Sequence, residues 1–250
     1  MKSDVRIGTS GWSYKDWIGN FYPADIPQTK WLEYYATQFD TVEVDNTFYR
    51  IPSEKTVLEW KKQTTPSFLF SLKFPQKITH VKMLRNADEE TQVFLARVAL
   101  LEEKLGPLLL QLPPNFKDEG LVFLRDFLRK LPKNNRYAVE MRNQKMLGPE
   151  LFAILRENDV TLTWADSAAA PAITEMTGKF IYIRWEGDRK KVNGTLGKTE
   201  IDQTNDTNQW AKKLKPFINK QEVFGYYSKY YSGNPTEDSQ YLMNNLQSKE

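Results

Sequence analysis

Charged side chains stand two residues apart at the ends of three apolar segments. The pairs are Glu43 with Asp45, Glu140 with Arg142, and Arg184 with Glu186. Because side chains two apart on a strand lie on the same face, the members of each pair can act together. Clustered carboxylates raise one another's pKa toward neutrality, where they transfer protons, and arginine side chains bind anions. The spacing therefore favours acid–base chemistry on an anionic substrate.

The expected site residues form two groups. The candidates for catalysis are Glu43, Lys73, Glu140 and Asp166. The candidates for substrate binding are Ser10, Trp12, Tyr49, His80, Gln111, Arg142, Arg184, Glu186 and Tyr227. We expect Glu43 to have the raised pKa of an acid or base, because Arg142 would hold Glu140 ionised. Each charged pair is equally compatible with a buried ion pair that only fixes the packing.

Aromatic residues are frequent near the same segments. They include Trp12, Tyr14, Trp17, Trp164, Trp185 and the tyrosines between residues 226 and 231. Flat rings of this kind can stack on a sugar ring or a nucleobase. We nevertheless expect most of them to pack in the core or against loops.

Composition limits the chemistry further. The single histidine and the absence of cysteine exclude a multi-histidine or thiolate zinc site, a disulfide and a cysteine nucleophile. Carboxylate oxygens could still bind Mg²⁺ or Mn²⁺, so the need for a divalent cofactor stays open. A net charge of +3 from 35 basic and 32 acidic residues is no nucleic-acid signature by itself. The sequence does not determine the oligomeric state.

Eight short apolar segments would position these residues. We expect strands at residues 5–10, 41–45, 69–74, 108–112, 137–142, 161–166, 180–187 and 222–228. Helical spacing predicts helices at about 31–39, 53–64, 86–105, 119–131, 149–158, 204–219 and 236–247. The third of these should begin at a capping box of Asn86 and Glu89 and stop at Gly106-Pro107.

Alternating strands and helices predict a parallel sheet, and eight units predict a single (β/α)8 TIM barrel over residues 1–250. Its sixth helix would be short, and residues 187–202 would form a long, lid-like loop. A doubly wound open sheet is the alternative, but no GxGxxG turn or Walker A loop is present. Active sites of TIM barrels lie at the carboxyl ends of the strands. We therefore expect one pocket that contains Glu43, Lys73, Gln111, Glu140, Arg142 and Arg184.

Five segments together resemble the YecE-like family, also called domain of unknown function 72. They are GTSGWSYKDWIGNFYP (8–23), VEVDNTFYRIPS (42–53), FSLKFPQKITH (70–80), GPLLLQLPPNF (106–116) and VEMR (139–142). The resemblance implies a TIM barrel and no established reaction. The chain departs from the family pattern at Glu186, where relatives commonly have histidine, and at YYSKYYSG (226–233), where they commonly have a Phe-Asn-Asn type of strand.

The function expected from these residues is acid–base or hydrolytic chemistry on a small polar anion, such as a sugar phosphate or a nucleotide-like compound. The enzyme would be a hydrolase or would resemble an isomerase. A non-catalytic or nucleic-acid-binding barrel is the alternative, with the basic residues from Arg189 to Lys198 contacting phosphates. A retaining glycosidase fits less well, because it needs two carboxylates about 5 Å apart and the fourth strand ends with Gln111. The start of the chain and its apolar runs predict a cytoplasmic protein without a membrane span.

Overall fold

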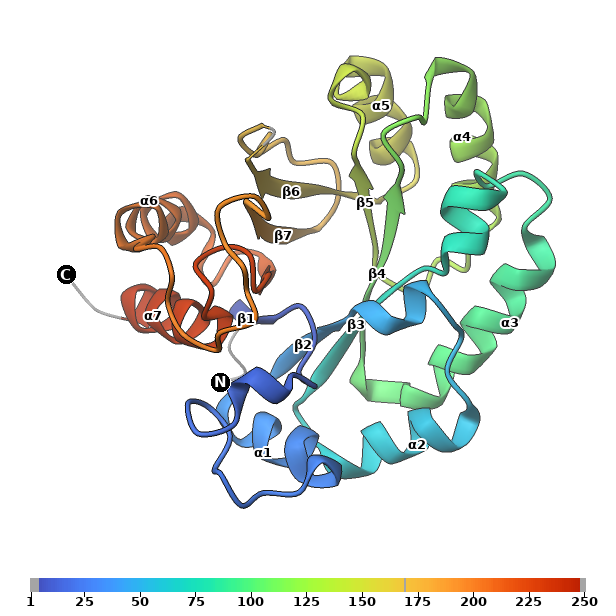
Figure 1. Ribbon diagram of the computed structural model, residues 1–250. Helices are drawn as coiled ribbons and strands as arrows, with labels where there is room; N and C mark the ends of the chain where they lie inside the picture. The colour runs from blue at the N-terminus through green and yellow to red at the C-terminus, as the bar shows by residue number, and fades with distance from the viewer. Residues whose placement is uncertain (1–4, 169, 248–250) are drawn as a thin grey trace. The chain divides into compact units, whose positions relative to one another are not determined.

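Strands and helices alternate along the chain (Figure 1). The computed structural model describes residues 5–168 and 170–247. The strands are β1 (Val5–Thr9), β2 (Thr41–Val44), β3 (Leu69–Lys73), β4 (Leu105–Leu112), β5 (Tyr137–Met141), β6 (Thr161–Ser167), β7 (Phe180–Gly187) and β8 (Glu222–Tyr227). The α-helices are α1 (Trp31–Gln38), α2 (Glu54–Gln63), α3 (Asp88–Val98), α4 (Leu121–Lys130), α5 (Pro149–Glu157), α6 (Thr204–Leu214) and α7 (Pro235–Gln247). Each expected strand is confirmed to within a few residues.

The strands form a sheet in the order β1-β8-β7-β6-β5-β4-β3-β2. The pairings of β8 with β1 and β7, and of β4 with β3 and β5, are parallel. A parallel bridge between Ser10 and Glu43 also connects the ends of β1 and β2. Strands that follow chain order, with the last beside the first, are the topology of a (β/α)8 barrel. The expected fold class is therefore confirmed, and the doubly wound alternative is excluded.

Within this topology the residues group into two compact units. The first, which we call the terminal unit, comprises Met1–Glu43, Ala165–Ala172 and Phe180–Glu250. The second, the central unit, comprises Val44–Trp164 and Ile173–Lys179. That residues 1–250 behave as a single domain stays a prediction.

The terminal unit has an aromatic core. Helix α7 packs on β1, β8 and α6, and the ring of Trp185 stacks on Tyr227 with centroids 4.1 Å apart. Trp210 of α6 meets Trp185 edge-on at 5.4 Å. Trp17, Tyr226 and these stacked rings are buried. The expectation that most aromatics pack in the interior is confirmed.

The central unit is built on the apolar runs of β3, β4 and β5. Helix α2 packs against α3, and α4 against α5. Gly106 allows β4 to approach β3 closely, because a Cβ there would lie 2.9 Å from the carbonyl oxygen of Phe70. Gly106 and Pro107 lie inside β4, so the expectation that they terminate the preceding helix before the strand begins is wrong.

The start of α3 also differs from the expectation. The helix begins at Asp88 and its cap residue, Ala87, makes no side-chain cap hydrogen bond. Asn86 has a φ of 49°, in the left-handed region, whereas an N-cap residue has extended backbone geometry. The prediction of a capping box of Asn86 and Glu89 is therefore wrong, because residues with positive φ form the turn before α3.

Two connections between regular elements contain no helix among their described residues, and the first of them interrupts the alternation of strands and helices. Residue 168 and residues 170–179, between β6 and β7, contain no helix, so the expectation of a short sixth helix in this connection is wrong. The connection from β7 to α6 is also free of helix, as expected.

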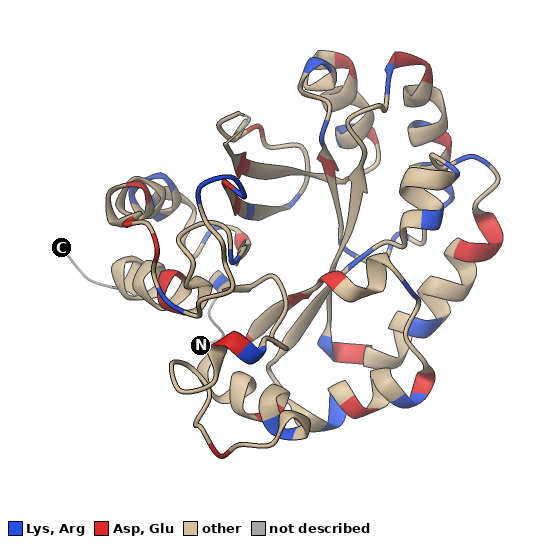
Figure 2. Cartoon of the chain, viewed as in Figure 1, with Lys and Arg blue, Asp and Glu red and all other residues tan. Residues whose placement is uncertain are grey.

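Acidic and basic residues are interspersed along the helices in Figure 2. In the part of the chain that the structure describes, no helix combines the length and apolar character needed to cross a bilayer.

Candidate functional site

Gln111 and Glu140 meet at the carboxyl ends of β4 and β5 in the central unit. The register of the two strands places these residues directly opposite each other, so their side chains lie on the same face of the sheet. The Gln111 amide donates to both carboxylate oxygens of Glu140, at 3.1 Å each. Both residues are buried. The amide thus orients the carboxylate.

Arg142 completes the environment of Glu140. The two residues stand two apart at the end of β5, and the arginine Nε forms an ion pair with a Glu140 oxygen. The side chain of Arg142 is 32% exposed, whereas that of Glu140 is 1% exposed. The expectation that arginine and glutamate pair at this strand end is confirmed. The side chain of Arg142 thus has partial access to solvent.

Lys73 ends β3 and is buried. Its Nζ lies 3.8 Å from Oδ1 of Asp45 and 4.4 Å from the centroid of the Phe48 ring. The Thr47 hydroxyl donates to the backbone oxygen of Lys73 at 2.7 Å. The short 3₁₀ helix at Asp45–Phe48 therefore positions the ammonium group of Lys73.

His80 lies in a π-helical turn, Lys77–Val81, that follows β3. Its Nδ1 is 2.9 Å from the Thr79 hydroxyl, and its ring meets Phe48 edge-on at 4.8 Å. Burial lowers the pKa of His80, and the positive charges of Lys73 and Arg142 lower it further against the opposing charge of Glu140. His80 is therefore neutral at pH 7, and it lies in a positive field.

The Thr79 hydroxyl lies close to two groups, the backbone oxygen of Pro75 at 3.3 Å and Nδ1 of His80 at 2.9 Å. The tautomer of the ring decides whether Nδ1 donates to this hydroxyl or accepts from it. In either tautomer of the neutral ring, one of the two nitrogens is basic. A basic nitrogen beside two cations can take a proton from a bound anionic molecule.

A second charged cluster lies in the terminal unit around Glu43, which is fully buried. The Arg184 guanidinium donates to the Glu43 carboxylate through Nε at 2.9 and 3.0 Å and through Nη2 at 2.8 Å. The hydroxyls of Tyr182 and Ser10 donate to the same carboxylate at 2.7 and 3.0 Å. Arg184 also forms an ion pair with Glu186.

These contacts favour a structural role for Glu43. Its two oxygens accept hydrogen bonds from three neighbouring side chains, and an arginine balances its charge. Burial and the Glu43 charge raise the pKa of Tyr182 well above its usual value, so the tyrosine remains a donor. Of the two roles expected for the charged pairs, acid–base chemistry or a buried ion pair that fixes the packing, this geometry favours the ion pair for Glu43 and Arg184.

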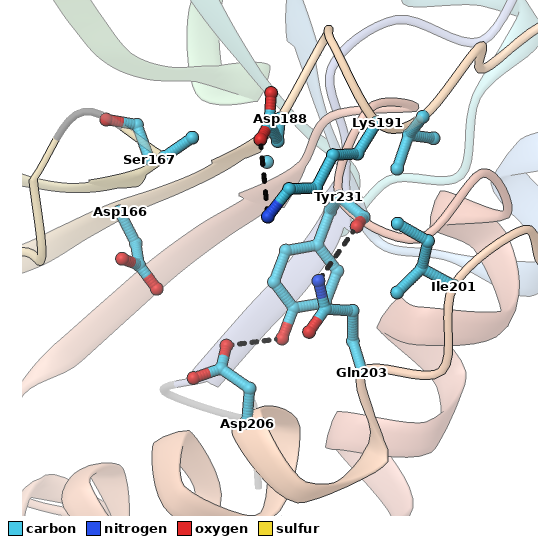
Figure 3. Close-up of a pocket in the computed structure, with 11 residues that line it drawn as sticks. Asp166, Ser167, Asp188, Lys191, Ile201, Gln203, Asp206 and Tyr231 are labelled. Atoms are coloured by element: carbon cyan, nitrogen blue, oxygen red, sulfur yellow. Dashed lines mark hydrogen bonds and ion pairs between the residues drawn. The ribbon is translucent and has the colours of Figure 1, made fainter.

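Asp166 lies in a cavity of the terminal unit, which has a volume of about 300 Å³ (Figure 3). The indole nitrogen of Trp210 donates to Oδ2 of Asp166 at 3.0 Å. Burial raises the pKa of Asp166, and the charge of Asp206 raises it further, while the Trp210 hydrogen bond and Lys213 oppose the shift. Asp166 lies in the terminal unit, whereas Glu140 lies in the central unit.

The remaining expected residues are aromatic. Tyr227 is fully buried against Trp185, so the structure gives its ring a packing role. Trp12 is partly exposed, and Tyr49 is 75% exposed. The sequence therefore identified residues that the structure brings together within each unit. A single pocket containing residues of both units stays a prediction.

Metal binding also stays a prediction. Among residues 5–168 and 170–247, no three histidine, aspartate or glutamate side chains are grouped so that they could hold a metal ion. Asp45 and Glu140 are instead next to the cationic side chains of Lys73 and Arg142.

Sequence reasoning missed two hydrogen-bonding groups. Tyr182 donates to Glu43, and the signal for it was its position two residues before Arg184 on the same strand. The Thr79 hydroxyl lies 2.9 Å from Nδ1 of His80, and its position directly before the histidine was the only signal. The cavity partners of Asp166 carried no signal, because they come from separate segments of the chain.

Comparison with known proteins gives a family match over nearly the whole chain. A family model described as "Protein of unknown function DUF72" matches residues 6–250. The protein YecE of Escherichia coli strain K12 is 36% identical over 149 residues, which cover 60% of this chain and 50% of that protein. The chain spans about half the length of the curated relatives it matches.

Solved structures show the same architecture. A DUF72 family protein from Thermotoga maritima superposes with a TM-score of 0.82 at 24% identity, over 98% of this chain and 99% of that chain. A D-psicose 3-epimerase from Clostridium cellulolyticum H10, described with D-tagatose, superposes with a TM-score of 0.58 at 10% identity, over 97% and 96% of the two chains. At these identities the similarity concerns the fold alone, which is TIM-barrel-like.

Proposed function

The chain belongs to the DUF72 family, and we propose that this member is an enzyme that performs acid–base chemistry on a small polar anion. The site of this chemistry is the cluster of Lys73, His80, Gln111, Glu140 and Arg142 in the central unit, which we call the β3–β5 cluster. The substrate class is a sugar phosphate or a nucleotide-like compound.

One observation carries the proposal: a neutral histidine lies in the combined field of a lysine and an arginine. Burial together with the charges of Lys73 and Arg142 lowers the pKa of His80. Positive charge that disfavours protonation of a histidine also favours an anionic ligand. The same two cations therefore attract the substrate and keep the imidazole in its basic form.

The residues of the cluster have different roles, in substrate binding and in proton transfer. The side chain of Arg142 is partly exposed, so its guanidinium can bind a phosphate or carboxylate, and Lys73 adds a point charge. His80 takes a proton through the basic nitrogen of its neutral ring, and Glu140, held by Gln111 and Arg142, is a carboxylate of fixed orientation. A proton that His80 abstracts must be returned to the product or released to solvent. An isomerisation and a hydrolysis both meet this requirement.

The fold similarity gives secondary support. D-psicose 3-epimerase is a sugar epimerase on a barrel related in architecture to this one. Active sites of TIM barrels lie at the carboxyl ends of the strands, where Lys73, Gln111 and Glu140 stand. This similarity supports the location of the site and a sugar-derived substrate, whereas the charges of the cluster support an anionic group on it.

Calorimetric titration tests the binding step. Inorganic phosphate and glucose 6-phosphate are titrated into the parent protein and into Lys73→Gln, which keeps a side chain of similar length without the charge. We expect the substitution to weaken binding about tenfold, which corresponds to roughly 1.4 kcal/mol. The matched control is Lys179→Gln, a lysine of the same unit whose side chain is 84% exposed. Equal affinity in all three proteins, or binding of Mg²⁺ in place of phosphate, would refute the proposal.

The catalytic step is tested with His80→Gln, which keeps hydrogen-bonding capacity and removes the basic nitrogen. Once turnover is found by screening sugar phosphates and nucleotides, we expect the rate to fall about 10²-fold or more while affinity for phosphate stays close to that of the parent. A variant that keeps full turnover would remove His80 from the mechanism.

Nucleic-acid binding is the second candidate, and one group of contacts favours it. In the terminal unit, the guanidinium of Arg189 lies 4.5 Å from the centroid of the Tyr230 ring, and Lys229 lies 5.2 Å from the same ring. Cations interleaved with aromatic rings can bind a single-stranded backbone and its bases. The discriminating measurement is the salt dependence of oligonucleotide binding, which falls steeply with salt when several phosphates are neutralised.

A further inference from the structure

The cavity around Asp166 has a lining unlike that of the β3–β5 cluster. It is formed entirely within the terminal unit, by the end of β6, the connection from β7 to α6, the start of α6 and the residues after β8. A volume of about 300 Å³ is large enough for a small organic molecule. The inference from this cavity goes beyond the proposed function and does not depend on it.

Fixed carboxylates provide the acceptors of the cavity. The Tyr231 hydroxyl donates to Oδ2 of Asp206 at 2.6 Å, and the Trp210 indole donates to Oδ2 of Asp166 at 3.0 Å. Figure 3 shows Asp166 and Asp206 on one side of the cavity, with the Tyr231 ring beside them. An ionised carboxylate has about four lone-pair positions, so each retains acceptor capacity after these bonds.

Other residues of the lining provide donors and an apolar surface. The ammonium of Lys191 lies 3.8 Å from Oδ2 of Asp188, and the Lys191 side chain is 74% exposed. Ser167 adds a hydroxyl beside Asp166, and Ile201 adds an apolar surface (Figure 3). Acceptors, donors and an apolar wall therefore surround the same space.

The charge of the lining discriminates between ligand classes. Three aspartates against one lysine disfavour an anion, and the Lys191 ammonium, 3.8 Å from Asp188, offsets part of the negative charge that would attract a cation. A neutral molecule with several hydroxyl groups satisfies both kinds of partner, because each hydroxyl donates to a carboxylate and accepts from the ammonium.

We propose that this cavity binds a small neutral polyol, such as a monosaccharide. The ligand's hydroxyls donate to Asp166 and Asp206, the Lys191 ammonium donates to a ligand oxygen, and the carbon skeleton lies against Ile201. The β3–β5 cluster, by contrast, selects an anionic group.

The test uses the indole N–H signal of Trp210 in NMR spectra of the full chain, assigned by its loss in Trp210→Phe. This group donates to Asp166, so its chemical shift reports on the cavity directly. D-glucose and glycerol are the neutral probes, with putrescine and inorganic phosphate as charged probes. We expect D-glucose to shift the signal saturably and independently of salt, and Asp206→Asn to weaken that binding about tenfold.

Control variants separate local from indirect effects. Asp118→Asn removes an exposed carboxylate of the central unit and should leave glucose binding unchanged. Lys191→Met removes the ammonium donor without touching the Tyr231–Asp206 hydrogen bond, so it keeps the test valid if Asp206→Asn is unstable. His80→Gln should not alter glucose binding, which separates this proposal from the function proposed for the β3–β5 cluster.

Three results would overturn the inference. One is an unchanged Trp210 signal at glucose concentrations of tens of millimolar. Another is a saturable shift with putrescine or phosphate alone, which would assign the cavity to a charged ligand. The third is glucose binding that neither Asp206→Asn nor Lys191→Met weakens, which would place the sugar elsewhere.

Discussion

The Glu43 cluster and the β3–β5 cluster have the same ingredients and differ in what surrounds them. Both contain a buried glutamate and an arginine at the carboxyl ends of strands. In the Glu43 cluster, the arginine is 4% exposed and three side chains donate to the carboxylate. In the β3–β5 cluster, the arginine is 32% exposed and lies near a lysine and a neutral histidine.

The difference teaches that a carboxylate–arginine pair does not by itself indicate chemistry. When both partners are buried and the carboxylate accepts hydrogen bonds from several neighbouring side chains, the pair fixes packing and leaves no group for a substrate. When one partner reaches solvent and further cations lie nearby, the same pair can bind a ligand. The four experiments that follow test this distinction, from the largest expected effect to the smallest.

Removal of the buried arginine should have the largest effect. Arg184→Ala leaves the fully buried Glu43 carboxylate without its counter-ion, and we expect a loss of about 3–5 kcal/mol in the free energy of unfolding. Arg142→Ala should cost less, roughly 1–2 kcal/mol, because the Arg142 side chain is 32% exposed, so solvent already weakens the pair, and because Gln111 still donates to both Glu140 oxygens. Urea denaturation of both variants, with Lys179→Ala as an exposed control, gives the comparison. Equal losses would show that the two clusters are equally structural.

Exchange of each glutamate for glutamine sharpens the comparison at constant volume. Glu43→Gln removes the charge that balances Arg184 and weakens the acceptor for Tyr182, which should cost about 2–3 kcal/mol. Glu140→Gln should cost about 1 kcal/mol, since Arg142 can turn to solvent. The measurement is again chemical denaturation. If Glu140→Gln were the more destabilising change, Glu43 would recover the catalytic role that the sequence favoured.

The tyrosine donor to Glu43 provides a smaller test. Tyr182→Phe removes one hydrogen bond to a buried charge and no packing atoms, so the expected loss is about 1.5–2 kcal/mol. Tyr49→Phe removes a hydroxyl from a residue that is 75% exposed and should leave stability unchanged. A thermal melt distinguishes the two. A neutral effect of Tyr182→Phe would mean that the remaining donors suffice to hold Glu43.

The pH dependence of stability should show the smallest effect. The pKa of His80 in the folded state is below its ordinary value of 6.5. Between the folded and unfolded pKa values the unfolded chain binds one more proton at this site, so stability rises with pH up to about 6.5. His80→Gln should flatten that rise, and urea melts from pH 5 to 8 measure it. A steeper rise in the variant would reverse the sign assigned to His80.

The sequence alone predicted each of the strands to within a few residues, because alternating and continuous apolar runs depend only on neighbouring residues. It also predicted that Glu140 and Arg142, and likewise Arg184 and Glu186, share a face of their strands, which the ion pairs confirm. The predicted start of α3 was wrong because Asn86 adopts a left-handed backbone conformation that no capping motif implies.

Only the tertiary structure decided which charges meet. Glu43 pairs with Arg184, 141 residues away, and Gln111 with Glu140, 29 residues away. Side-chain periodicity places a residue on a face of its own strand, whereas its partners follow from sheet register and from the path of the loops. The sequence by itself therefore determined the kinds of groups at the strand ends, and the fold determined which of them are neutralised and which remain accessible to a ligand.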